Sequence, residues 1–310
     1  MECILVGDTG SGYKEQLLVA ESMVELIQSE PEIKCVMIVG DNIYPDGCYG
    51  VKDRQFIDKF QNPYKNIHLP FYLCLGNHDY SPKWGIRAQI DYTKSKENVT
   101  LQSKLKKWNL PREWYTQSFP QCDFFMINTN MDQLTEDSID KQLQDTVQAI
   151  KNSKKHWKIL CGHHTWRSVG GHGNAISDMP HFETFMKDLL AEVKIDLYVC
   201  GHDHCKSIIE VGDHKTPTLV IGTGGKQYDE DLYYPDNMKA DGSKLKFFSP
   251  ELGVCHFKAT KDSIILTCYT ETLRKEKTYT ISKRSKKTNS RGTKRRTRRR
   301  KRSRRRRRRN

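Results

Sequence analysis

The chain has 310 residues, of which 36% are hydrophobic, and its formal charge is +14. This length and apolar fraction are adequate for one large α/β domain or two small ones with a packed core. No apolar stretch is long enough to span a membrane. The composition therefore favours a globular protein and excludes a membrane-spanning one.

The positive charge is concentrated at the C-terminus. Residues 283–310 contain 19 basic side chains and no acidic one, so residues 1–282 keep 33 basic against 38 acidic, a net charge of −5. We predict a folded domain over 1–282 and a disordered Arg/Lys-rich tail over 283–310, which is too charged to fold alone. Nucleic acid is the favoured partner of the tail; the alternatives are an acidic protein or membrane, a nuclear import receptor, or no dedicated partner.

The N-terminus and the cysteines indicate the cellular compartment. Met1 leads directly into apolar sequence, without the basic start and cleavage site of a signal peptide. Ten cysteines are spread through residues 1–282 without the paired spacing of a zinc knuckle. We therefore expect reduced thiols and an intracellular location, cytoplasmic or nuclear, and an unused glycosylation sequon at Asn98-Val99-Thr100.

Strand and helix patterns alternate up to residue 200. Six short apolar runs predict buried strands with functional loops at their ends: Cys3–Val6, Val36–Val39, Phe71–Leu75, Phe124–Ile127, Ile159–Cys161 and Leu197–Cys200. Two apolar stripes predict amphipathic helices: Leu17, Ala20, Val24 and Ile27, and Ile139, Leu143, Val147 and Ile150. This alternation is typical of an α/β fold.

Two other regions follow different patterns. Residues 81–120 are rich in Trp, Tyr, Lys and Pro, and we expect them to cover one end of the domain as a long insertion. Beyond residue 205, short β-type runs punctuated by Gly, Pro and Asp predict a second sheet of antiparallel strands: Thr218–Ile221, Gly253–Phe257, Ile264–Tyr269 and Thr278–Ile281.

Five polar blocks each follow a predicted strand. They are Gly7-Asp8-Thr9-Gly10, Gly40-Asp41-Asn42-Ile43-Tyr44, Gly76-Asn77-His78-Asp79, Gly162-His163-His164 and Gly201-His202-Asp203-His204. Any one block alone is typical of a turn or a helix cap. Five of them at one edge of a sheet would form a crowded polar cluster, which is costly unless it binds something. Carboxylate, amide and imidazole ligands suit Fe, Mn and Zn, and the lack of cysteine argues against a structural zinc.

In order and spacing, the blocks resemble the signature of the calcineurin-like metallophosphoesterases over roughly residues 1–270. Tyr44, three residues after Asp41, is similar to the tyrosine ligand of the purple acid phosphatases. Trp166-Arg167-Ser168 and Gly171-His172-Gly173, together with the chain length, resemble the small tartrate-resistant type. The resemblance implies an α/β fold of two packed mixed β-sheets flanked by helices, a four-layer α/β/β/α sandwich.

The same resemblance implies two metal ions, Fe(III) with Fe(II), Zn(II) or Mn(II). Asp41 would bridge them, Asp8, Tyr44 and His204 would complete the ferric position, and Asn77, His163 and His202 the divalent one. His78, oriented by Asp79, would bond the phosphoryl group, and His172, on a flexible Gly-flanked loop, would protonate the leaving group. For Tyr44 the alternative is plain packing, for His172 an exposed loop histidine, and His164 is interpreted as pocket lining.

The implied function is a binuclear-metal phosphomonoesterase of the acid phosphatase type, in which a metal-bound hydroxide attacks phosphorus directly and phosphoproteins are candidate substrates. The alternatives are a phosphodiesterase or nuclease with the same site, and a basic nucleic-acid-associated protein in which hydrolysis is secondary. The sequence departs from the exported tartrate-resistant type in its N-terminus, its short segment from Asn130 to Glu136 and its basic tail.

Overall fold

The computed structural model describes residues 1–82, 85–99, 105–212, 215–227, 236 and 242–283. The tail predicted over 283–310 lies outside this part of the chain except for Lys283. The strands are β1 Glu2–Val6, β2 Ile33–Ile38, β3 Phe71–Leu73, β4 Trp108–Asn109, β5 Tyr115–Ser118, β6 Cys122–Met126, β7 Trp157–Cys161, β8 Leu197–Cys200, β9 Lys206–Val211, β10 Thr216–Ile221, β11 Lys244–Ser249, β12 Gly253–Ala259, β13 Ser263–Thr270 and β14 Lys275–Ser282. The helices are α1 Lys14–Ser29, α2 Gly85–Tyr92, α3 Glu136–Asn152, α4 Ala175–Asp178 and α5 Pro180–Glu192, with short helices η1 Ile57–Gln61, η2 His78–Tyr80 and η3 Met131–Gln133.

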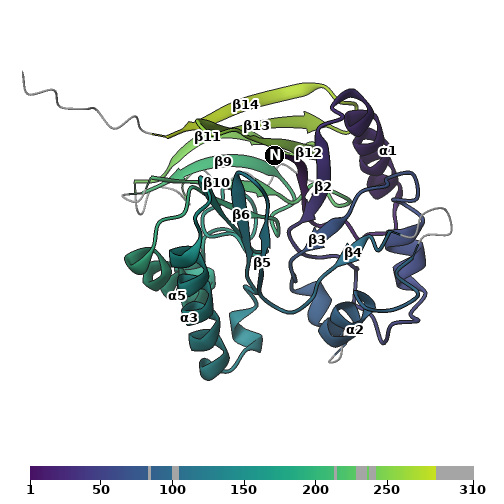
Figure 1. Ribbon diagram of the computed structural model, residues 1–310, viewed down its shortest axis with the longest axis horizontal. Helices are drawn as coiled ribbons and strands as arrows, with labels where there is room; N and C mark the ends of the chain where they lie inside the picture. The colour runs from purple at the N-terminus through teal and green to yellow at the C-terminus, as the bar shows by residue number, and fades with distance from the viewer. Residues whose placement is uncertain (83–84, 100–104, 213–214, 228–235, 237–241, 284–310) are drawn as a thin grey trace, which may run out of the picture.

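The strands form two mixed sheets of seven strands each. Sheet A has the order β14-β13-β12-β1-β2-β3-β4, and sheet B has the order β11-β9-β10-β8-β7-β6-β5. Helix α1 lies beside sheet A, and α3 and α5 lie side by side next to sheet B (Figure 1). One apolar core joins the two sheets, and a second lies between sheet B and its helices. The predicted fold class is confirmed, as are all six predicted strands.

The strands after residue 205 do not form a separate sheet, so that prediction is wrong. Strands β9 to β11 extend sheet B next to β8, while β12 to β14 extend sheet A next to β1. Ile4 of β1 lies opposite His256 of β12 in an antiparallel ladder. A buried strand such as β1 needs hydrogen-bond partners on both edges, and β12 supplies the second edge.

The two predicted helices are present, but one apolar stripe is rotated by about one residue. In α1 the buried side chains include Gln16, Val19, Met23 and Leu26, whereas Leu17 is 47% exposed. Sequence hydrophobicity misplaced the stripe because buried Gln16 bonds the Lys59 carbonyl with its side-chain nitrogen. In α3, the predicted stripe faces the protein and ends at buried Ile150.

The region 81–120 contributes edge strands to both sheets as well as helix α2. Trp108 of β4 is fully buried, and its backbone N–H and C=O bond the side chain of Asn98. Asn98 is itself fully buried, which agrees with an unused sequon. All ten cysteines are free and buried. Within the described residues, no helix combines the length and apolar character needed to cross a bilayer.

Candidate metal centre

The five polar blocks meet at the common end of both sheets. The first three follow β1, β2 and β3 of sheet A, and the last two follow β7 and β8 of sheet B. We expected them at one edge of one sheet; instead two packed sheets share the cluster, because these strands all end on the same side. Asp8, Asp41 and His202 have φ of 57°, 53° and 69°. Such left-handed backbone is unusual for residues other than glycine and is typical of functional turns.

Glycine at one turn brings the two sheets together. Gly40, with φ 92°, precedes Asp41, and a Cβ at this position would lie 2.6 Å from Nδ1 of His163 on the other sheet. Only glycine permits both this backbone conformation and this close approach.

Asp8, Tyr44 and His204 form one group of side chains. Tyr44 Oη donates to Asp8 Oδ1 at 3.0 Å. His204 Nε2 lies 3.6 Å from the same oxygen and 3.4 Å from Tyr44 Oη. The other oxygen of Asp8 accepts from the backbone N–H of His202 at 3.0 Å. These three side chains are the ones that the resemblance assigns to the ferric position.

Asp41, Asn77, His163 and His202 form the second group. His163 Nδ1 lies 2.9 Å from the Val39 carbonyl oxygen and donates to it, so Nε2 keeps its lone pair. That Nε2 lies 3.0 Å from Asn77 Oδ1 and 3.4 Å from Asp41 Oδ1. Nδ1 of His202 lies 3.1 Å from Asn77 Oδ1. His163 Nε2, Asn77 Oδ1 and Asp41 Oδ1 are all acceptors, and no proton lies between the nitrogen and the two oxygens. Their lone pairs repel one another unless a cation lies between them.

The donor set fits metal ions in spacing and in charge. Single ligand atoms of Asp8, Asp41 and His163 all lie within 4.8 Å of one another. Two metal–ligand bonds of about 2.1 Å at a right angle separate their ligand atoms by about 3.0 Å, close to the distances observed. Burial raises the pKa of Asp8 well above its usual range, although His163 opposes this. Burial also lowers the pKa of His204 to about 4, so its imidazole is neutral and able to bind a metal at neutral pH.

The chain is similar to known proteins. The family model for calcineurin-like phosphoesterases matches residues 1–206. The chain belongs to this family. Purple acid phosphatase 7 of Arabidopsis thaliana is 32% identical over 73% of this chain and 70% of its own length. Human tartrate-resistant acid phosphatase type 5 is 25% identical over 82% and 76%, respectively.

Solved structures agree on the fold. The purple acid phosphatase of yellow lupin seeds has a TM-score of 0.68 and 17% identity, covering 91% of this chain and 53% of its own. The GAP50 anchor of the inner membrane complex of Plasmodium has a TM-score of 0.75 and 19% identity, covering 93% and 90%. The family and the purple acid phosphatase relatives identify the chain as a metal-dependent phosphatase of the acid phosphatase type.

Asp79 of this phosphoesterase does not orient His78, contrary to our expectation. Its buried carboxylate accepts from the backbone N–H groups of Asn42 at 3.0 Å and Gly76 at 2.8 Å, and from the Gln89 side chain at 2.8 Å. Burial, and next the charge of Asp41, raise the pKa of Asp79 to about 7. The hydrogen bonds of Asp79 thus connect the loop that carries Asp41 to the loop that carries Asn77.

The Pro45 carbonyl orients His78 instead. Nδ1 of His78 lies 2.6 Å from this oxygen, which can only accept, so Nδ1 is the protonated nitrogen. The ring also packs against that of Tyr44, with centroids 4.4 Å apart. His78 therefore keeps Nε2 available for other contacts.

Several hydrogen bonds connect the loop that carries His172 to its surroundings, and the expectation that this loop is flexible stays a prediction. The Thr165 hydroxyl donates to the Gly173 carbonyl at 2.8 Å, and the Ser168 N–H donates to Asn174 Oδ1 at 2.8 Å. The backbone N–H of His172 donates to Asp203, between the two histidines of the last block, at 2.7 Å. The exposed ring of His172 stacks on His202, with centroids 4.1 Å apart.

A buried ion pair anchors the same loop to helix α5. Arg167, only 4% exposed, makes two bonds to the carboxylate of Glu183, at 2.8 and 3.1 Å. Trp166 donates to the same carboxylate at 2.9 Å. The block that resembled the tartrate-resistant type therefore supports the loop.

Sequence reasoning missed two residues beside the cluster. Thr129 follows β6 and accepts from the backbone N–H groups of His163 and His164. Polar Asn128-Thr129-Asn130 after an apolar strand was the same signal that marked the other five blocks. Lys226 Nζ lies 4.8 Å from the ring centroid of Tyr44; no sequence signal pointed to it.

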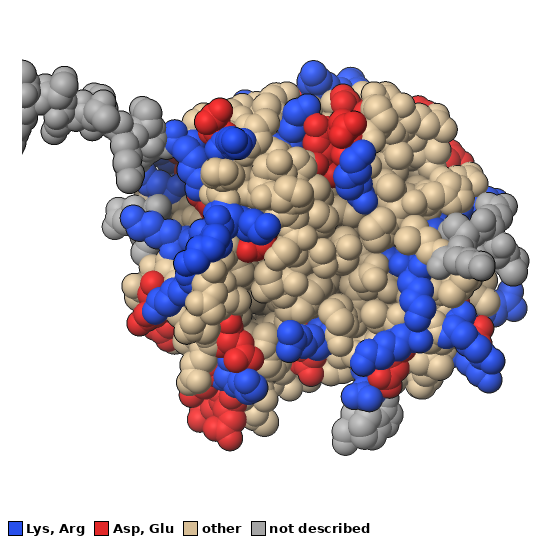
Figure 2. All heavy atoms as spheres, in the orientation of Figure 1, with Lys and Arg blue, Asp and Glu red and all other residues tan. Residues whose placement is uncertain are grey.

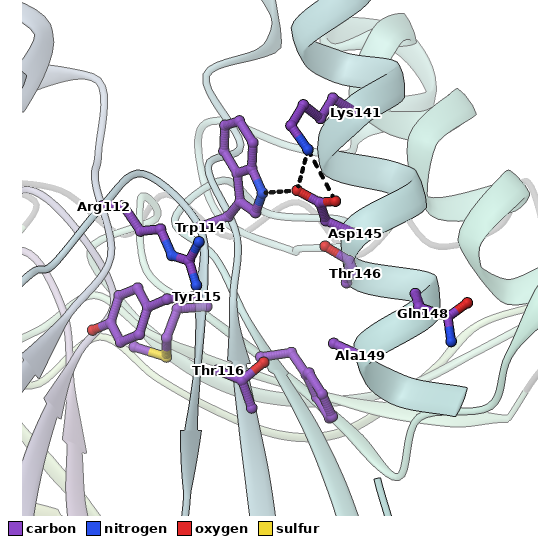
Figure 3. A pocket seen from close by; sticks show the side chains of 11 residues that line it. Arg112, Trp114, Tyr115, Thr116, Lys141, Asp145, Thr146, Gln148 and Ala149 are labelled. Carbon is purple, nitrogen blue, oxygen red and sulfur yellow. Dashed lines mark hydrogen bonds and ion pairs between the residues drawn. The ribbon is translucent and has the colours of Figure 1, made fainter. Parts of the chain in front are cut away.

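Two cavities differ in chemistry. A cavity of about 400 Å³ lies between β5 and α3, where Asp145 is already paired with Lys141 and Trp114 (Figure 3). Its one carboxylate is therefore already paired, and the cavity lies away from the candidate metal centre. A pocket of about 280 Å³ adjoins the candidate metal centre and is lined by Asn77, Asp132, His164, Thr165, His172, Asn174, Ala175, Asp178, Met179 and His202. This second pocket is the one that can hold a substrate beside the cluster.

Proposed function

We propose that the chain is a binuclear-metal phosphomonoesterase. The observation that carries the proposal is the convergence of His163 Nε2, Asn77 Oδ1 and Asp41 Oδ1, which face one another as acceptors. Asp41 would bridge two ions, one held by Asp8, Tyr44 and His204 and one by Asn77, His163 and His202. The metals proposed are Fe(III) with Fe(II), Zn(II) or Mn(II).

The chain's own residues would position the ester and move one proton. Two cations supply charge neutralisation and acidify water, which is the chemistry needed for direct attack on phosphorus. His78 would donate to a phosphoryl oxygen when both its nitrogens carry protons. His172 would give its proton to the departing oxygen. Desolvation lowers the pKa of His172, so the protonated ring that this role needs forms at a lower pH than for an ordinary histidine, in keeping with an acid phosphatase.

Tyrosinate coordination to iron gives the sharpest test. Iron-loaded protein is expected to show a visible absorption band that Tyr44→Phe removes, because Tyr44 supplies the phenol next to Asp8. Tyr49→Phe is the matched control, since Tyr49 is 76% exposed. A colourless iron-loaded protein, or a band that survives in Tyr44→Phe, would contradict the proposal.

The substrate class is tested by comparing two chromogenic esters. We expect faster hydrolysis of a nitrophenyl monoester than of a bis-nitrophenyl diester, with phosphopeptides as candidate natural substrates. Preference for the diester would support the phosphodiesterase alternative.

The tail is proposed to bind a polyanion, nucleic acid above all. Its 19 basic residues from 283 to 310 contrast with the net charge of −5 over 1–282. Acidic and basic side chains are interspersed on the face of the body in Figure 2. Removing residues 283–310 should abolish salt-sensitive binding to nucleic acid and spare monoester hydrolysis. If nucleic-acid binding persists after this truncation, the binding surface lies on residues 1–282 instead. The intracellular location stays a prediction.

A further inference from the structure

His164 has one ring nitrogen whose role nothing above explains. The side chain is 5% exposed and lines the pocket beside the candidate metal centre. Its ring centroid lies 4.5 Å from that of His202 and 5.1 Å from that of His163. His164 therefore lies against both imidazoles proposed for the divalent position.

The hydrogen bonds of Thr129 determine which nitrogen of His164 is protonated. Thr129 Oγ1 accepts from the backbone N–H of His163 at 3.2 Å and from that of His164 at 3.0 Å. A threonine hydroxyl has two lone pairs and one proton, so both lone pairs are occupied. Its proton is left for Nδ1 of His164, 2.8 Å away. Nδ1 is thus the acceptor, and Nε2 of the neutral ring carries the hydrogen.

The Nε2–H group has no protein acceptor. No group in the described part of the chain bonds it. The Nε2 atom is not fully buried, and because His164 lines the pocket, this atom is open to the pocket.

We propose that His164 Nε2–H donates a hydrogen bond to a phosphate oxygen of the bound substrate, with Thr129 fixing the tautomer. This inference rests on the proposed phosphomonoesterase function. His164 becomes a substrate-binding residue, and Thr129 a positioning residue that acts through it. The donor lies beside His202, which lines the same pocket.

The test compares variants that keep the donor with variants that remove it. His164→Leu removes the Nε2–H group, whereas the amide of His164→Gln can place an N–H near the same point. Thr129→Val removes the hydroxyl, and Thr129→Ser keeps it. Each metal-loaded, full-length variant is measured for metal content, thermal unfolding, inorganic phosphate binding by calorimetry, and KM and kcat on nitrophenyl phosphate.

We expect phosphate binding to weaken about 10- to 100-fold in His164→Leu, the range for a hydrogen bond to a charged acceptor, with metal content unchanged. His164→Gln and Thr129→Ser should recover most of this loss. Thr129→Val should weaken binding, and adding it to His164→Leu should cause little further loss.

Unchanged phosphate affinity in a folded, metal-loaded His164→Leu variant would overturn the inference. If that variant fails to fold, equal phosphate affinity in Thr129→Val and Thr129→Ser would overturn it as well. Failure of the proposed function has a different signature, since wild-type protein would then lack two bound metals or monoester hydrolysis.

Discussion

The two sheets supply chemically different halves of the candidate metal centre. Sheet A provides the oxygen half, Asp8, Asp41, Tyr44 and Asn77, and sheet B provides the nitrogen half, His163, His202 and His204. Neither half alone offers a complete set of ligands for two ions. The difference teaches that the site is a property of the interface between the sheets and not of either sheet.

Removing the proposed bridge from the oxygen half should have the largest effect. Asp41→Ala is expected to lower kcat/KM by more than about 100-fold. Losing a residue that only hydrogen-bonds to a metal ligand already costs about 10- to 100-fold, and losing the ligand itself should cost more. Metal analysis should show less than two ions per chain. Asp91→Asn, which removes only an exposed ion pair with Arg87, is the control. Retained activity in Asp41→Ala would refute the metal assignment.

A substitution that separates the oxygen half from the nitrogen half should have the next largest effect on activity. Gly40→Ala places a methyl group 2.6 Å from Nδ1 of His163 and strains a backbone with φ 92°. We expect activity to fall about 10- to 100-fold with loss of metal, since the methyl group displaces a proposed ligand. Gly50→Ala, where a Cβ meets nothing within 4 Å, should leave activity and metal content intact. Equal behaviour of the two variants would mean that the halves tolerate separation.

The smallest effect on activity is expected from the support of the nitrogen half. Glu183→Gln leaves buried Arg167 without its full partner and should lower the free energy of unfolding by roughly 3 kcal/mol at pH 7. Denaturant unfolding measures this difference. Glu192→Gln, on the same helix α5 but in an exposed pair with Lys151, should change little.

The same pair predicts a pH dependence. Burial opposes ionisation of Glu183, but the hydrogen bond and charge of Arg167 outweigh it, and the pKa lies below its usual value. The ionised carboxylate therefore stabilises the fold above the unfolded pKa of about 4.3, and this stabilisation is lost as the pH falls through the folded pKa. The difference between wild type and Glu183→Gln should close below about pH 4. A constant difference from pH 7 to pH 3 would show that the charge of Glu183 is not responsible.

Sequence reasoning located the strand ends well because the signal is local. An apolar run followed by Gly and a ligand-type side chain needs no knowledge of the rest of the fold, and the candidate ligands do converge. Hydrogen-bond partners were harder to predict, because they depend on which loops meet in space. Asp79 bonds Asn42 and Gly76 rather than its neighbour His78, and the Pro45 carbonyl holds His78.

Sheet membership could not be predicted for a similar reason. The pairing of Ile4 with His256 joins residues from opposite ends of the domain, and no local pattern encodes it. The stripe of α1 was misplaced at Leu17 because a buried glutamine, Gln16, takes a position that hydrophobicity assigns to an apolar residue.

The pairing of β1 with β12 also sets the order in which the protein can mature. Asp8 follows β1, and β1 lacks one of its neighbours until residues 253–259 have been synthesised. A nascent chain thus carries both aspartates of the first two blocks while strand edges remain open to aggregation. The proposed ligands extend to His204, and β1 gains its second neighbour only with residues 253–259, so we expect metal to bind after most of the domain has been synthesised.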